Sequence, residues 1–208
     1  MKVVCTADTH GMHKHLEVPD GDIFIFTGDM TDAGNNQSLL DFNEFLGALP
    51  HRYKIVIDGN HDLAPEKIRE FITNATYLRH NLLEIENLKI WGTSWSYWLN
   101  NQIELIKKQQ DLSLFWQTIP ANIDILITHF PPYQIGDLTN SGKHLGNKDL
   151  LEALRRIKPR YHVFGHVHEA YGVYENKIED FDITHINASA IKGFGTELKP
   201  PIVFTIYS

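Results

Sequence analysis

Short apolar runs that are followed within two residues by histidine, aspartate or asparagine are the feature of this sequence that most restricts its fold. Five such runs occur, and each is typical of a buried strand: Val3–Ala7, Ile23–Thr27, Lys54–Asp58, Ile123–Thr128 and Tyr161–Phe164. Apolar residues at helical spacing fill several of the intervals between these runs. A chain that alternates strands with helices favours an α/β fold.

The rest of the chain supports the same class. Helical patterns cover the region before Leu49, with Asn36 or Ser38 as N-cap, and three further segments: Pro65–Ile72, about 102–119, and Asn147–Ile157. Further short strands are expected at Tyr77–Leu78, Leu82–Ile85, Lys89–Gly92, Ala170–Tyr174, Asp182–Asn187 and Ile202–Ile206. No Pro/Gly/Ser-rich linker interrupts the 208 residues, so we expect one domain spanning residues 1–208.

Composition excludes several functional classes. Hydrophobic residues make up 42% of the chain, which is enough for a core and excludes a disordered protein. The formal net charge of −7 disfavours a binder of long nucleic acid, because that affinity depends on many cationic contacts with phosphates. No apolar run is long enough to cross a membrane, and the single cysteine, Cys5, fits a reducing compartment. We therefore expect a cytoplasmic location and no membrane partner.

Polar residues follow the five runs at the point where each strand would end. They are Asp8-Thr9-His10, Gly28-Asp29, Gly59-Asn60-His61-Asp62, His129, and Gly165-His166-Val167-His168. Ligands of open α/β sheets bind at the carboxyl ends of the strands, so these loops can converge on one pocket. Each segment alone is also compatible with an ordinary turn or helix cap, but five of them in this order favour a shared site.

The residue types in these loops indicate divalent metal ions. Imidazole nitrogens and carboxylate or amide oxygens suit borderline and hard divalent cations. Alternate residues of an extended segment point the same way, so Asp8 with His10, and His166 with His168, can each bind one ion. Asp29 has two oxygens and can bridge two ions. The pattern therefore predicts a dinuclear site.

With these five segments, the sequence resembles the calcineurin-like metallophosphoesterase superfamily. The five motifs of that superfamily match residues 8–10, 28–34, 59–62, 129 and 165–168. The flanks are similar to the brain-protein-239 group of metallophosphoesterase-domain proteins, on Val18-Pro19-Asp20-Gly21-Asp22, Pro159–His166, Asn187-Ala188-Ser189 and Pro200-Pro201-Ile202-Val203. Members of that group hydrolyse phosphodiesters, including cyclic nucleotides.

The resemblance implies a fold and a ligand set. The implied fold is a four-layer αββα sandwich of two mixed β-sheets flanked by helices. The first metal would be held by Asp8, His10, Asp29 and His168, and the second by Asp29, Asn60, His129 and His166. Two positions depart from related proteins. Phe130 stands where the group has glycine, and Ala33 stands where protein phosphatases have arginine, which argues against a protein phosphatase.

The implied reaction is hydrolysis by a hydroxide that bridges the two ions, with His61 facing the substrate and protonating the leaving alkoxide. Asp62 either orients His61 or caps the helix that begins near Pro65. Asn60, Lys143 and His144 are further candidates for substrate contacts. The expected cofactors are two divalent ions, Mn²⁺ first and Fe or Zn²⁺ as alternatives.

The expected substrate is a small phosphodiester, with cyclic nucleotides as the leading candidates. The aromatic residues Trp95, Tyr97 and Trp98 pack in the core or stack on a nucleobase. The alternatives are a phosphomonoesterase or a nuclease of the same superfamily, and a non-catalytic metal-binding interaction module. A zinc lactamase or peptidase is excluded because neither His-x-His-x-Asp-His nor His-Glu-x-x-His occurs. The sequence leaves the oligomeric state open.

Overall fold

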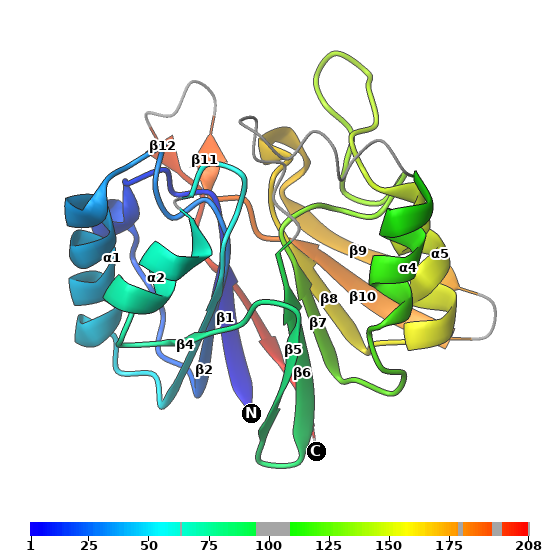
Figure 1. Ribbon diagram of the computed structural model, residues 1–208, viewed down its shortest axis with the longest axis horizontal. Helices are drawn as coiled ribbons and strands as arrows, with labels where there is room; N and C mark the ends of the chain where they lie inside the picture. Colours follow the sequence, from blue (N-terminus) through cyan, green and yellow to red (C-terminus); the bar gives the residue numbers. More distant parts are fainter. Residues whose placement is uncertain (63, 95–108, 179–180, 193–196, 208) are drawn as a thin grey trace.

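The structure is a computed structural model that describes residues 1–62, 64–94, 109–178, 181–192 and 197–207. Two β-sheets are stacked face to face, and helices cover the outer face of each (Figure 1). Both sheets contain parallel and antiparallel pairs. The expected four-layer sandwich of two mixed sheets flanked by helices is confirmed.

The first sheet has the strand order β13-β1-β2-β3-β4. Its strands are β1 (Lys2–Thr6), β2 (Ile23–Thr27), β3 (Tyr53–Ile57), β4 (Thr76–Tyr77) and β13 (Ile202–Thr205). Strands β1 to β4 are parallel, and β13 runs antiparallel to β1. Helices α1 (Asn36–Ala48) and α2 (Pro65–Phe71) pack on its outer face (Figure 1).

The second sheet has the order β5-β6-β7-β8-β10-β9. Its strands are β5 (Asn81–Ile85), β6 (Leu88–Thr93), β7 (Ile125–Thr128), β8 (Tyr161–Phe164), β9 (Gly172–Ile178) and β10 (Phe181–Asn187). The four central strands are parallel, whereas β5 and β9 form antiparallel edges. Helices α4 (Gln109–Gln117) and α5 (Lys148–Ile157) cover its outer face (Figure 1).

Three small elements of the described part of the chain lie outside these layers. They are the 3-10 helices η1 (His13–His15) and η2 (His168–Ala170), and a hairpin formed by β11 (Ile191–Lys192) and β12 (Glu197–Leu198). Among the described residues no helix has both the length and the apolar character needed to cross a bilayer.

Alternating side chains of the central strands build separate cores on the two faces of each sheet. In β2, Ile23 and Ile25 join the core between the sheets, whereas Phe24 and Phe26 join the core under α1 and α2. In β7, Leu126 likewise packs under α4 and α5, while its neighbours face the other sheet. Strands buried on both faces are continuous apolar runs in the sequence, which explains why these strands are predicted well.

Several predicted boundaries move by a few residues. Helix α1 is capped by Asn35, whose side chain accepts a hydrogen bond from Ser38 N at 3.2 Å, so neither Asn36 nor Ser38 is the N-cap. Asn147 caps α5 and is not its first residue. Strand β9 begins at Gly172 because Ala170 belongs to η2.

Candidate functional site

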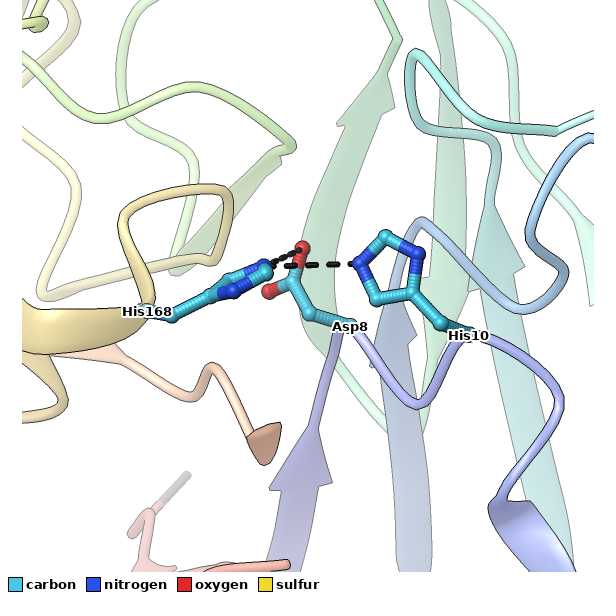
Figure 2. A group of neighbouring side chains, drawn as sticks. All are labelled: Asp8, His10 and His168. Carbon is cyan, nitrogen blue, oxygen red and sulfur yellow. Dashed lines mark hydrogen bonds and ion pairs between the residues drawn. The ribbon is translucent and has the colours of Figure 1, made fainter. Parts of the chain in front are cut away.

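The first group of candidate ligands lies where β1 and β8 end. Asp8 and His10 follow β1, and His168 begins η2 after β8 (Figure 2). The Nε2 atoms of His10 and His168 lie 3.4 Å apart, and His168 Nε2 lies 3.8 Å from Asp8 Oδ1. Each side chain offers one ligand atom, and these atoms lie within 4.8 Å of one another. Such a cluster can bind one divalent cation.

A second group comes from the loops after β2, β7 and β8. Asp29, His129 and His166 offer ligand atoms that also lie within 4.8 Å of one another. The side chain of Asn60, after β3, joins them: its Oδ1 lies 2.9 Å from His129 Nε2 and 3.0 Å from His166 Nδ1. The loops that follow five parallel strands therefore meet at one edge of the sandwich, as the sequence predicts.

Asp29 contacts a histidine of each group. Its Oδ2 lies 3.4 Å from His129 Nε2 and 3.7 Å from His10 Nε2. Its other oxygen, Oδ1, accepts a hydrogen bond of 2.8 Å from the backbone N–H of His61. Asp29 can therefore offer the same oxygen to both groups of candidate ligands.

The surroundings of His129 fit a cation. Its Nδ1 lies 2.8 Å from the carbonyl oxygen of Thr27, which can only accept, so Nδ1 carries a hydrogen. Its Nε2 then faces two more acceptors, the Asn60 and Asp29 oxygens. Burial disfavours a charged ring, but the Asp29 and Asp8 carboxylates and the Thr27 carbonyl together outweigh burial and raise the pKa of His129 to about 10. A proton or a metal ion at Nε2 satisfies all these acceptors.

Four of the candidate ligands have left-handed backbones. The φ angles are 51° at Asp8, 43° at His10, 55° at Asp29 and 70° at His166. This region is uncommon for residues other than glycine and persists where the surroundings enforce it, often at functional sites. The expectation of extended segments is therefore wrong. Asp8 and His10 still meet, but His166 and His168 fall into different groups.

His61 has a carboxylate neighbour, Asp32, that the five motifs do not indicate. Its Nδ1 lies 3.0 Å from Asp32 Oδ1, and His10 Nδ1 lies 3.7 Å from the same oxygen. The side chains of His61 and Asp32 are 45% and 65% exposed, so a substrate can reach them. Asp32 stands in the turn Gly28–Gly34, three residues after a candidate ligand, and that spacing was the available signal. The carboxylate that contacts the His61 ring is therefore that of Asp32. One prediction from the sequence assigned this position to Asp62.

Asp62 does not cap α2, which corrects the other role expected for it. The N-cap is Ala64, and no side chain caps this helix. The buried Asp62 carboxylate instead accepts backbone N–H bonds from Gly59 (2.9 Å), Thr31 (2.9 Å) and Met30 (3.3 Å). Burial raises the pKa of Asp62 to about 7. Its hydrogen bonds fasten the loop after β3 to the loop after β2.

The loop between β7 and α5 carries Lys143 and His144. His144 Nδ1 lies 2.7 Å from Oδ1 of the buried Asp137, and Lys143 is exposed. The same loop approaches the site through Asn140, whose N–H points to Glu169, the residue after His168, at 3.5 Å. The substrate contacts expected of Lys143 and His144 stay predictions.

Phe130 supplies an aromatic wall beside the second group. The centroid of its ring lies 4.1 Å from that of His166, at an interplanar angle of 50°. The side chain that replaces glycine here therefore lies against a candidate ligand. The aromatic residues proposed to stack on a base, Trp95, Tyr97 and Trp98, lie outside the described residues.

We expect Gly59→Ala to damage the site through crowding. A Cβ at this position would lie 2.1 Å from Asp29 Oδ1 and 2.7 Å from His129 Cε1. Overpacking of this kind typically costs about 1–3 kcal/mol, and here it must displace Asp29. Urea unfolding should show the lost stability, and titration with Mn²⁺ should show weakened binding. Gly47→Ala, in α1, is the control and should bind Mn²⁺ as the wild type does; unchanged binding in Gly59→Ala would contradict the crowding argument.

Known proteins are similar in sequence to this chain over most of its length. Residues 1–170 match the profile described as calcineurin-like phosphoesterase. Human metallophosphoesterase domain-containing protein 1 is 33% identical over 99% of this chain and 71% of its own length. A protein of Arcobacter nitrofigilis named probable glycerophosphodiester phosphodiesterase GpdQ is 31% identical over 80% of this chain and 64% of its own length.

A solved structure shares the fold at low sequence identity. The crystal structure of TT1561 of Thermus thermophilus superposes with a TM-score of 0.59 at 11% identity, covering 88% of each chain. This likeness supports the two-sheet sandwich and says nothing further about the chemistry.

Proposed function

Because this chain belongs to the calcineurin-like phosphoesterase family, we propose that it is a metal-dependent phosphodiesterase that hydrolyses small diesters, with cyclic nucleotides as the leading candidates. The observation that carries the proposal is the position of Asp29 between two groups of ligand atoms. The half-exposed ring of His61 stands beside the first group, with its centroid 4.7 Å from that of His10.

The residues present fit two divalent cations. Asp8, His10, Asp29 and His168 would hold one, and Asp29, Asn60, His129 and His166 the other. This set of imidazole, carboxylate and amide ligands suits Mn²⁺, Fe or Zn²⁺. The structural support for a cation at this site is that the Asn60 and Asp29 oxygens both lie close to His129 Nε2. When bound, divalent ions neutralise charge on phosphate oxygens and lower the pKa of water.

His61 is the proposed leaving-group acid. The Asp32 carboxylate accepts from Nδ1 and so fixes the orientation of the ring. The other ring nitrogen, Nε2, is left to exchange a proton with a substrate. An alkoxide is a poor leaving group until it is protonated, so this step matters most for alkyl esters.

Charge favours a diester over a monoester. A monoester dianion usually needs cationic contacts beyond the two ions, and the arginine that protein phosphatases place before Gly34 is Ala33 here. A diester carries a single charge. The relative named as a glycerophosphodiester phosphodiesterase supports the same class, and the net charge of −7 disfavours long DNA or RNA.

The direct test compares kcat/KM for bis-p-nitrophenyl phosphate and p-nitrophenyl phosphate at saturating Mn²⁺. We expect the diester to be preferred, and 2′,3′-cyclic nucleotides to be cleaved at least as well as the 3′,5′ isomers. A monoester preference of about tenfold or more, some 1.4 kcal/mol in transition-state binding, would indicate a phosphomonoesterase. No cleavage of either ester with any divalent ion would favour a non-catalytic module.

A further inference from the structure

Ser189 lies where the two sheets meet, in the segment that follows β10. On one side, Ala7 N donates to Ala188 O at 2.9 Å and Ala190 N donates to Ala7 O at 2.8 Å. On the other side, Ala188 N donates to Phe164 O at 2.8 Å. The segment is therefore bonded to the end of β1 in the first sheet and to the end of β8 in the second. Ser189 is held at the base of the candidate site.

The Ser189 hydroxyl donates a hydrogen bond to Asp8 Oδ2. The backbone N–H of His166 lies 2.9 Å from the same oxygen and 3.2 Å from Oδ1. Asp8 and Ser189 are both fully buried. Oδ2 therefore has two donors, whereas Oδ1 has, among the described residues, only the longer contact with the His166 N–H and lies on the side of His168 Nε2, 3.8 Å away (Figure 2).

Asn187 fixes the position of Ser189. Its buried side chain donates to the carbonyl oxygens of Gly136 and Val167, at 2.9 Å each. Its Oδ1 accepts a hydrogen bond of 3.1 Å from Ser189 N. Val167 lies between two candidate ligands, so one amide joins the motif that carries them to the segment that carries Ser189.

We infer that Ser189 is a positioning residue for metal binding: its hydroxyl holds one Asp8 oxygen so that the other is presented to an ion at His10 and His168. The inference rests on the proposed function, because it assumes that the first group binds a cation. Without the hydroxyl, the Asp8 carboxylate loses a partner and can rotate away from the ligand geometry. Losing a hydrogen-bond partner of a metal ligand typically weakens metal affinity by about 10–100-fold.

The test is a Mn²⁺ titration of the full chain, followed by the electron paramagnetic resonance signal of free Mn²⁺. In Ser189→Ala we expect one of two bound ions to bind about 10–100-fold more weakly and the other to be unchanged, because Asp8 belongs to one group only. Ser94→Ala is the matched control. Ser94 is also buried and donates to a carboxylate, Asp58, that is not a candidate ligand. It should lose stability without a change in Mn²⁺ affinity.

Three results would overturn the inference. If the wild type binds two ions and Ser189→Ala binds each of them as tightly as the wild type does, Ser189 does not position Asp8, and the proposed function stands. Equal weakening of both ions would indicate a general structural role. If the wild type binds no divalent ion, both the inference and the proposed function fail. Should Ser189→Ala not fold, Ser189→Cys, similar in size but a weaker donor, should weaken one ion selectively and by a smaller factor.

Discussion

Asp29→Asn is expected to lower kcat/KM for a diester by more than about 100-fold. Loss of a residue that only supports a metal ligand costs up to about 100-fold in activity, and Asp29 is proposed as a ligand itself. The physical reason is that Asp29 Oδ2 lies between histidines of both groups, 3.4 Å from one and 3.7 Å from the other. An amide in this place lacks the negative charge that both ions would share. Metal analysis of the purified variant should therefore find at least one ion missing.

The substitution is conservative for the fold. An asparagine keeps the Oδ1 atom, which accepts the hydrogen bond from His61 N, so the loop after β3 retains its anchor. Circular dichroism and thermal unfolding should confirm that the variant folds. Asp20→Asn, on the exposed surface, is the control and should keep both ions and full turnover. Two tightly bound ions with full activity in Asp29→Asn would disprove the bridging role.

The strands could be predicted because the sandwich buries both faces of its central strands. Runs such as Ile23–Thr27 must be apolar throughout, and few other structures demand this over five residues. The edge strands β4, β5 and β13 also lie within one residue of their expected bounds, whereas β9 and the β11–β12 hairpin were harder to predict. Strand β9 alternates exposed and half-buried residues at its start, and the β11–β12 hairpin has only two residues in each strand. Such short pairs carry little periodicity from which to predict them.

The types of the candidate ligand residues could be predicted from the sequence. The contacts that each side chain makes could not. Polar residues at strand ends indicate a shared pocket whatever the conformation of each loop. The partner of His61 depends on that conformation: the backbone is left-handed at Asp29 and Ala33, and the turn between them brings Asp32 to the ring. Asp62, adjacent in sequence to the histidine, bonds instead to the backbone of a neighbouring loop.

Sequence patterns do not predict contacts between segments that are far apart in the chain. Ser189 and Asp8 are 181 residues apart, and neither spacing nor periodicity joins them. They meet because the segment after β10 is hydrogen-bonded between the two sheets, a consequence of stacking that only the three-dimensional structure provides.

His61→Ala is expected to separate metal binding from catalysis. The ring lies beside the candidate ligands without belonging to either ion's expected set, so the variant should bind both ions normally. Its rate on alkyl diesters should fall by roughly 10²–10⁴-fold, the usual contribution of a general acid. The loss should be much smaller for nitrophenyl esters, because a nitrophenolate leaves readily without a proton. Measurement of kcat for both ester types, with the metal content checked, tests the role.

The partner of His61 provides a graded comparison. Asp32→Asn keeps the shape of the side chain but removes the charge 3.0 Å from His61 Nδ1, so the ring remains present and is held less firmly. Its loss should follow the same order, larger for alkyl than for nitrophenyl esters, yet smaller than that of His61→Ala. Equal losses on both ester types in His61→Ala would argue against proton donation. In that case His61 would act on a step common to both substrates, such as binding of the phosphate.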